Sequence, residues 1–283
     1  MQQKIETVKT LLEALPFIKK FSGEIIVIKY GGAAQTKQEL KEMFARDVVL
    51  LSLVGIRPVI VHGGGKSITE MLDKLQIPTE FRNGQRVTCK ESMRIVEMVL
   101  SGEINNEIVS LLNHHGARAV GLNGKAAECI KATPLENGNY GYTGEITAVD
   151  PEILEKLLHE KLIPVIAPIA AGEELGHPGY NINADLAASA IAAAIKAKKV
   201  IFMTDTPGVL DGDKQLLSSL NEVSIEALKH SGVIAGGMIP KVDACLEAVH
   251  GGVEKAHIID GRIEHSLLLE LFTDEGIGTQ VTA

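Results

Sequence analysis

Two lysines stand next to paired glycines in well-separated parts of the sequence. Lys29 follows a short apolar run and precedes Gly31 and Gly32, and Lys241 follows a Gly-Gly pair at residues 236–237. Glycine lets backbone N–H groups come close to phosphate oxygens, and a lysine ammonium adds positive charge at the same place. The sequence therefore predicts two phosphate-binding segments. A lysine that ends a strand is also often a solvated surface charge, so neither segment identifies a site alone.

Three consecutive glycines, Gly63, Gly64 and Gly65, form a third candidate segment between an apolar run and a helical pattern. A strand, a glycine loop and a helix N-terminus together make an anion site. The spacing of a Walker motif is not met, because Ile60 stands where its first glycine should be. A tight turn is the alternative, but it needs only one or two glycines. We also expect a capping box at the helix start, formed by residues 67–70.

An arginine and a cluster of polar residues could bind the rest of a substrate. Arg86 follows an Asn-Gly turn signal, and its planar guanidinium matches a carboxylate with two hydrogen bonds, although a surface arginine is equally compatible with this segment. Residues 181–185, with the sequence Asn-Ile-Asn-Ala-Asp, open an alanine-rich helix. One helix cap needs only one of these polar side chains. Asn181 and Asp185 are therefore available to orient a substrate or neighbouring lysines.

Phosphoryl transfer to a carboxylate is the chemistry that these groups fit. Such transfer depends mainly on positioning and on neutralising charge. A carboxylate with an ordinary pKa of about 4.3 is already ionised at neutral pH, so it needs no general base. The sequence contains no GxSxG nucleophile motif that would favour a hydrolase. Asp205 ends a further apolar run at residues 200–204, a position suited to contact a nucleotide.

The composition excludes several other classes of function. The chain has 283 residues, 45% of them hydrophobic, and a net charge of -8 with both signs interleaved, so we expect neither nucleic-acid nor membrane partners. Its three cysteines, Cys89, Cys129 and Cys245, follow no disulfide or zinc pattern. We therefore expect reduced thiols, a cytoplasmic location and no protein-bound metal site.

Short apolar runs alternate with helical patterns along most of the chain. This alternation predicts an α/β fold with a mainly parallel central sheet covered by helices on both faces. A Gly- and Tyr-containing stretch at residues 129–149 predicts an inserted hairpin. Apolar residues at helical spacing over residues 5–15 predict an amphipathic N-terminal helix, whose pattern Pro16 interrupts. The predicted strands are residues 25–28, 58–61, 117–122, 163–168, 200–204 and 256–259.

Taken together, the motifs resemble the amino-acid kinase family, and within it the branch that phosphorylates N-acetyl-L-glutamate. The resemblance runs over nearly the whole chain and rests on residues 27–32, 59–65, 83–88, 181–185, 204–205 and 236–241. It implies transfer of phosphate from ATP with Mg2+ to the side-chain carboxylate of N-acetyl-L-glutamate, in arginine biosynthesis. It also implies a three-layer αβα sandwich, with a lobe at about 21–180 for N-acetylglutamate and a lobe at about 181–283 for ATP.

The resemblance further implies a role for each motif residue. Lys29 and Lys241 would stabilise the transferring phosphoryl group, while Asp185 would hold both lysines in place. The implied substrate-binding residues are Gly64, Gly65, Arg86 and Asn181, and the implied nucleotide-binding residues are Gly31, Gly32, Asp205 and Lys241.

The two ends of the chain look like those of the arginine-inhibited members of that family. In those members an N-terminal helix, here residues 1–20 ahead of a kinase domain at 21–283, interlaces dimers into a hexamer, a trimer of dimers. Arginine binds near that helix and the C-terminal segment. The candidate arginine-binding residues are Lys199, His265, Glu275 and Gly278. The alternative is a helix that packs on its own domain.

Two rival functions stay open from the sequence. Another kinase of the same fold, such as an aspartate or carbamate kinase, would share the phosphate-binding segments, although aspartate kinases usually carry further regulatory modules. A non-catalytic arginine-sensing protein would share the ends of the chain. The combination of Lys29, Asp185 and Lys241 argues against it, because a pure binding module does not need all three.

Overall fold

A single eight-stranded sheet organises the computed structural model, which describes residues 1–174 and 176–283. The strand order is β12-β14-β13-β11-β1-β2-β8-β5, and neighbouring strands are parallel except β13 and β14. The strands are β1 (Ile25–Tyr30), β2 (Arg57–His62), β5 (Ala119–Asn123), β8 (Ile163–Ala167), β11 (Lys199–Thr204), β12 (Ser219–Asn221), β13 (Lys255–Asp260) and β14 (Thr279–Thr282). The predicted α/β class with a mainly parallel sheet is confirmed.

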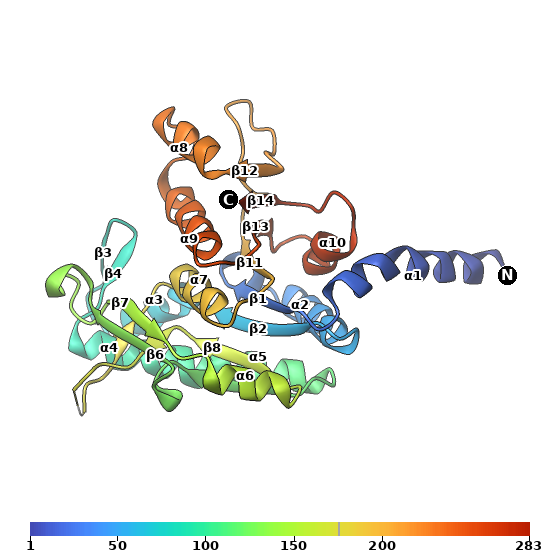
Figure 1. Cartoon of the computed structure of the whole chain (residues 1–283). Coiled ribbons are helices and arrows are strands. Elements are labelled where there is room, and N and C mark those ends of the chain that lie inside the picture. The colour runs from blue at the N-terminus through green and yellow to red at the C-terminus, as the bar shows by residue number, and fades with distance from the viewer. Residues whose placement is uncertain (175) are drawn as a thin grey trace.

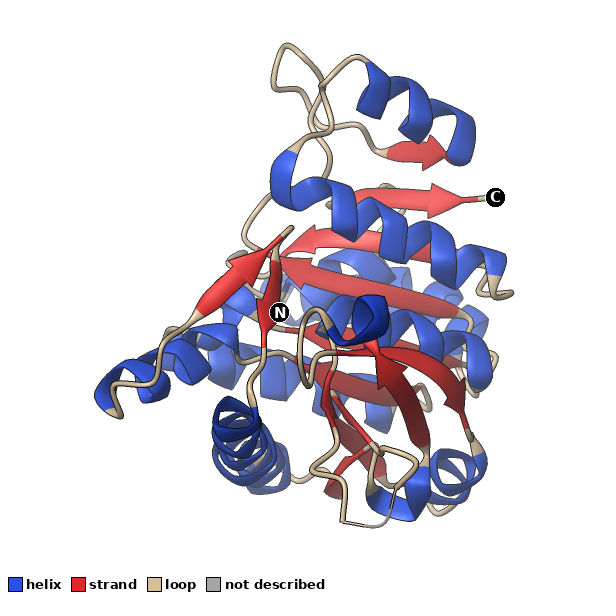
Figure 2. Cartoon of the chain, turned by 90° about the vertical axis from the view of Figure 1, so that its left-hand side faces the viewer, coloured by secondary structure: helices blue, strands red, loops and turns tan. Residues whose placement is uncertain are grey.

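Helices cover both faces of this sheet, as Figure 2 shows with helices in blue on either side of red strands. Alternate side chains of β1 enter different cores: Ile26 and Ile28 pack in one, Val27 in the other. The first core includes α2 (Gln38–Leu53), α3 (Gly65–Lys74), α4 (Lys90–Glu97), α5 (Asn105–His114) and α10 (Ser266–Phe272). The second includes α6 (Glu152–His159), α7 (Ala184–Ala194), α8 (Glu222–His230) and α9 (Ile239–His250). The predicted three-layer arrangement is therefore confirmed.

Two small hairpins lie beside the main sheet. The predicted excursion forms β6 (Ile130–Pro134) and β7 (Gly144–Val149), which pair antiparallel. The second hairpin, β3 (Glu80–Arg82) with β4 (Gln85–Val87), turns at the Asn-Gly signal and carries Arg86. A third antiparallel pair joins β9 (Ile169–Ala170) to β10 (Tyr180–Asn181) just ahead of α7.

The N-terminal helix α1 (Gln2–Phe21) extends away from the rest of the molecule (Figure 1). Pro16 lies inside α1, so the prediction that it interrupts the helix is wrong. A proline removes one hydrogen bond but does not forbid a helix whose other residues favour it. Large apolar side chains are exposed along this helix, namely Ile5, Val8, Leu11, Leu12 and Leu15. None of the described helices is both long enough and apolar enough to traverse a bilayer.

Candidate active site

A cleft of about 240 Å³ opens where strands β1 and β2 end. Parallel strands bring their carboxyl ends to one edge of a sheet, and ligands of open α/β folds bind along that edge. The cleft brings together many of the residues that the sequence singled out: Lys29, Gly32, Gly64, Gly65, Arg86, Asn181 and Asp185. They come from β1 and the turn that follows it, the glycine loop, the β3–β4 hairpin, β10 and the start of α7.

Asp185 lies between the two lysines. Its Oδ1 is 2.9 Å from Lys29 Nζ, and its Oδ2 is 3.3 Å from Lys241 Nζ. Lys29 is only 8% exposed, so it is not a solvated strand-end charge. Burial alone would raise the pKa of Asp185, but the two ammonium groups outweigh it and lower the pKa. The site therefore holds two cations against one ionised carboxylate, which leaves net positive charge beside the cleft.

The glycine loop joins β2 directly to α3. Gly63 N–H donates to Tyr30 O at 2.9 Å, which ties the loop to the end of β1. Helix α3 begins at Gly65 with Gly64 as its N-cap residue. The predicted capping box is therefore wrong, because Ser67 lies within the helix and cannot cap it. The uncapped first turn leaves backbone N–H groups available to an anion.

Gly31 and Gly32 keep the end of β1 open. A Cβ atom on Gly31 would lie 3.2 Å from Lys29 Nζ, so a side chain there would crowd the lysine. Gly32 has a φ of 62°, which favours glycine at this turn.

Arg86 is 6% exposed, and its Nη2 donates to Gly65 O at 3.1 Å and to Thr69 Oγ1 at 2.8 Å. Its guanidinium carbon lies 4.6 Å from the centre of the Phe81 ring. Burial lowers the pKa of Arg86. Its Nη1 is buried and finds no hydrogen-bond acceptor within the described residues. A buried, unpaired donor beside the cleft is suited to a carboxylate of a ligand.

The polar residues at the start of α7 divide their tasks. Asn183 Oδ1 accepts from the backbone N–H groups of Asp185 and Leu186, so it is the helix cap. Asn181 Nδ2 instead donates to Thr88 Oγ1 at 3.2 Å and lines the cleft. The prediction that one polar residue caps the helix is confirmed, and Asp185 does contact the neighbouring lysines, whereas a substrate role for Asn181 stays a prediction.

Asp205 lies at the same sheet edge but outside the set of residues that line the cleft. It is exposed and follows β11, the strand next to β1, and its Oδ1 accepts from Thr204 Oγ1 at 3.2 Å. Lys241 also lies on that side of Asp185, in the first turn of α9. A ligand that contacts both Asp205 and Lys241 would therefore extend from the cleft to the C-terminal end of β11 and the first turn of α9.

A second cavity of about 250 Å³ lies between α1 and the C-terminal segment. Three of the four arginine-site candidates line it, namely Lys199, Glu275 and Gly278. His265 does not, and its Nδ1 is instead 2.6 Å from Asp47 Oδ1. Sequence reasoning missed other residues that line this cavity, including Phe17, Lys20, His257 and Glu270, because their spacing carried no motif.

Buried charges surround this second cavity. His257 Nδ1 lies 2.5 Å from Glu270 Oε1, with both side chains 5% exposed. Burial lowers the pKa of Lys199 to about 8, while Glu270 opposes that shift. Burial also lowers the pKa of His257, again opposed by Glu270. The cavity is therefore lined by both carboxylates and lysines, which suits a ligand that carries both signs of charge.

Comparison with known proteins places the chain in a family. The family model described as the amino acid kinase family matches residues 24–260. The chain is 66% identical over 281 residues to acetylglutamate kinase of Nitratiruptor sp., covering 99% of each chain. It is 65% identical over 282 residues to acetylglutamate kinase of Sulfurimonas denitrificans, covering 100% of each.

Solved structures share the fold. N-acetylglutamate synthase of Neisseria gonorrhoeae, complexed with coenzyme A and N-acetyl-glutamate, matches with a TM-score of 0.87 and 25% identity. The match covers 98% of this chain and 63% of that one, so the synthase is the longer protein. Carbamate kinase of Giardia lamblia bound to AMP-PNP matches with a TM-score of 0.71 and 17% identity, over 92% of this chain and 98% of that one.

Proposed function

The chain belongs to the amino acid kinase family and is a kinase, and we propose that its acceptor is the side-chain carboxylate of N-acetyl-L-glutamate. The reaction transfers the terminal phosphoryl group of ATP and yields N-acetyl-L-glutamyl 5-phosphate, the second step of arginine biosynthesis. The observation that carries the proposal is the pairing of both lysines with Asp185 beside a cleft that also contains Arg86.

Each group has a task in this reaction. Arg86 and Asn181 bind the acceptor, with Arg86 Nη1 donating to the carboxylate that does not react. Lys29 and Lys241 neutralise the charge that spreads over the phosphoryl oxygens, and Asp185 keeps the two ammonium groups in place. The glycine loop supplies backbone donors, and Asp205 contacts the nucleotide. No side chain needs to remove a proton.

We assign Mg2+ to the phosphates of the nucleotide. Both oxygens of Asp185 face lysines, and no group of three or more His, Cys, Asp or Glu within the described residues could hold a metal ion. Mg2+ commonly keeps several waters and binds through substrate phosphates. Bound in this way, it would neutralise part of the phosphate charge.

A hydroxylamine trap tests the acceptor. Purified protein with ATP and N-acetylglutamate should give an acyl phosphate that hydroxylamine converts into a coloured hydroxamate. Aspartate and carbamate are the comparison acceptors, since they represent the rival kinases. Turnover with either of these but not with N-acetylglutamate would overturn the substrate assignment.

We also propose that arginine inhibits the enzyme from the second cavity and that the protein works as a cytoplasmic hexamer, a trimer of dimers joined through α1. The support is the chemistry of that cavity, which carboxylates and lysines line together, and the exposed apolar side chains of α1. Removing residues 1–20 should abolish sigmoidal inhibition by arginine. Unchanged inhibition after that truncation would contradict the proposed site.

A further inference from the structure

A buried histidine and a buried asparagine hold the glycine loop from the side opposite to solvent. His62 is the last residue of β2 and is fully buried, and Asn105 begins α5 at 3% exposure. His62 Nε2 lies 3.1 Å from Asn105 Nδ2, and His62 Nδ1 lies 3.2 Å from the backbone oxygen of Gly63. The two side chains thus connect α5 to the first peptide of the loop.

The carboxamide of Asn105 has one allowed orientation. Its Nδ2 donates to Val165 O on β8 at 2.9 Å and lies 3.5 Å from Leu122 O on β5. A carbonyl can only accept, so the NH2 group and not the oxygen must face these two strands. The carboxamide oxygen occupies the space beside Gly121, where a Cβ would lie 1.9 Å from it.

This orientation fixes the tautomer of His62. The NH2 group of Asn105 donates towards Nε2, so Nε2 must be the acceptor and the proton of the neutral ring sits on Nδ1. Nδ1–H then donates to Gly63 O. Burial lowers the pKa of His62 to about 4, which keeps the ring neutral near pH 7. The backbone carbonyl of Val165 therefore determines the direction of both hydrogen bonds of the His62 ring, the one from Asn105 and the one to Gly63 O.

The fixed carbonyl determines where the next N–H points. Gly63 O also lies 3.4 Å from Gln35 Nε2, so two donors hold it on the inner side of the loop. In a trans peptide the C=O and the following N–H point in opposite directions. Gly64 N–H must therefore face away from His62, and it finds no acceptor within the described residues. Gly64 itself lines the cleft.

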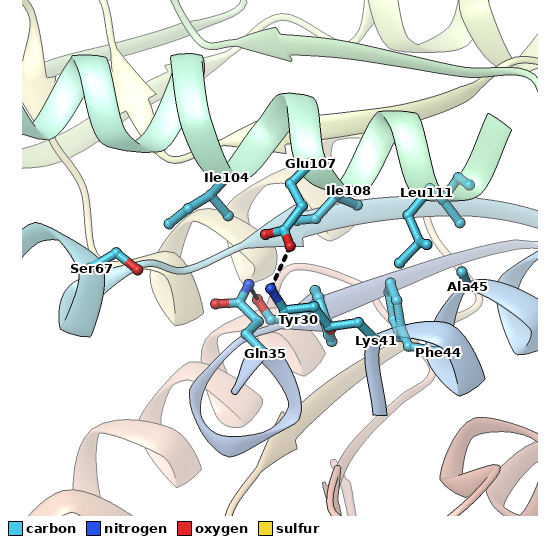
Figure 3. Close-up of a pocket in the computed structure, with 11 residues that line it drawn as sticks. Tyr30, Gln35, Lys41, Phe44, Ala45, Ser67, Ile104, Glu107, Ile108 and Leu111 are labelled. Carbon is cyan, nitrogen blue, oxygen red and sulfur yellow. Dashed lines mark hydrogen bonds and ion pairs between the residues drawn. The ribbon is translucent and has the colours of Figure 1, made fainter. Parts of the chain in front are cut away.

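A π-helical segment, Met98–Ile104, brings the supporting residues to this place. A Cβ on Gly64 would lie 2.4 Å from Ile104 Cδ1 and 2.6 Å from Leu100 Cδ2, so both side chains touch the loop directly. In Figure 3, Ile104, the last residue of this segment, points down from the helix towards the side on which Gln35 lies. π-helical turns are rare and occur frequently near functional sites. This one places Asn105 against His62 and two apolar side chains against Gly64.

We propose that His62 and Asn105 are positioning residues for phosphoryl transfer: they orient the Gly63–Gly64 peptide so that Gly64 N–H donates to an oxygen of the transferring phosphoryl group. The proposal rests on the kinase reaction proposed above. It predicts that the donor on Nδ1, and not the bulk of the ring, sustains turnover.

Two uncharged substitutions distinguish the effect of the Nδ1–H donor from that of the imidazole ring as a whole. In His62→Asn the side-chain NH2 stands near the position of Nδ1 and can still donate to Gly63 O. In His62→Gln the carboxamide reaches towards the position of Nε2 and can accept from Asn105, but Gly63 O loses the donor of residue 62 and keeps, among the described residues, only Gln35 Nε2 at 3.4 Å. We expect kcat to fall no more than about 3-fold in His62→Asn and about 100-fold in His62→Gln, the usual effect of losing one backbone donor. KM for both substrates should change little.

Gly121→Ala tests the relay without altering His62. The added Cβ displaces the Asn105 carboxamide, so the His62 ring loses the contact that orients it, and kcat should fall by more than in His62→Asn but by less than in His62→Gln, which removes the donor itself. His114→Gln is the control, because His114 is an exposed histidine on α5. Its kcat should equal that of the wild type. Equal kcat losses in His62→Asn and His62→Gln, beyond their differences in melting temperature, would overturn the proposal.

The tautomer of His62 can be measured in the wild-type protein, so this test needs neither an activity assay nor a variant that folds. Long-range 1H–15N spectra of the 15N-histidine-labelled wild-type protein distinguish a ring protonated at Nδ1 from one protonated at Nε2. We expect Nδ1–H at pH 7 for His62, and Nε2–H would overturn the proposal. Hydroxamate formation by the wild type tests the reaction itself, so a wrong tautomer and a wrong acceptor would be distinguished.

Discussion

Lys29 Nζ lies 2.9 Å from Asp185 Oδ1, although the two residues belong to β1 and α7 and stand far apart in the sequence. The same carboxylate faces Lys241 from α9. Removal of one member of a buried ion pair leaves an uncompensated charge, which costs more than the pair contributes. Asp185 is thus the group on which the arrangement of both cations depends.

Asp185→Asn should therefore lower both turnover and stability. The asparagine has the same size but cannot neutralise the two ammonium groups, so we expect a loss in kcat of about 100-fold or more and a destabilisation of about 3 kcal/mol. Hydroxamate formation and urea unfolding measure the two effects. Asp243→Asn is the matched control, because Asp243 on α9 pairs with Lys229 at the surface and should change little. Wild-type kcat in Asp185→Asn would contradict the assigned role.

Arg86→Lys should weaken acceptor binding more than it slows turnover. Lysine keeps the positive charge but cannot donate to Gly65 O and Thr69 Oγ1 while also reaching a ligand carboxylate. We expect KM for the acceptor to rise about 10-fold or more, with KM for ATP unchanged. Arg82→Lys on the same hairpin is the control, since Arg82 is exposed and pairs with Glu80. A rise in KM for ATP instead would place Arg86 on the nucleotide side.

Stability should fall as the pH drops below about 6.5, in part because of His62. Burial lowers the pKa of His62 from 6.5 to about 4. Between these values the unfolded chain takes up a proton that the folded chain does not, so the contribution of His62 is fully present above 6.5 and is lost as the pH approaches 4. The loss amounts to about 3 kcal/mol.

Urea unfolding at pH 7 and pH 4.5 measures this contribution. His62→Asn has no titrating ring, so its free energy of unfolding should fall by about 2 kcal/mol less between these pH values than that of the wild type. An identical fall in both proteins would show that His62 is protonated in the folded state at pH 4.5.

Leu11→Glu should reduce the size of the proposed hexamer. Leu11 is 67% exposed in the single chain, and α1 extends away from its own domain. A buried charge in an apolar contact between copies is costly, so the variant should have a lower mass by light scattering. Lys4→Glu on the same helix is the control. An unchanged mass for Leu11→Glu would mean that this position lies outside any contact between copies.

The sequence predicts the strands that contain long apolar runs but not the strands that are short and polar. All six predicted strands lie in the main sheet, because a parallel strand buried on both faces needs several consecutive apolar residues. Strands β12 and β14 escaped prediction. Each has one buried apolar side chain between polar residues, a pattern that many loops share.

The candidate site could be predicted in its residue types but not in its contacts. Glycine runs beside lysines predict phosphate-binding segments, and Lys29, Arg86, Asn181 and Asp185 do lie around one cleft. The link between His62 and Asn105 could not be predicted, because it depends on a π-helical turn and on the missing side chain of Gly121. The contacts of His265 could not be predicted either. Its position in the sequence suggests the second cavity, but the geometry at the start of α10 directs its side chain to Asp47.

The position of β14 in the sheet has a consequence for synthesis on the ribosome. β14 lies between β12 and β13, yet it comes later in the chain than both. β12 therefore has to wait, with its backbone groups unpaired, until residues 279–282 have emerged and inserted beside it. Strands β1, β2, β8 and β5 can pair with one another well before that, so the nascent chain should acquire protease resistance in two stages.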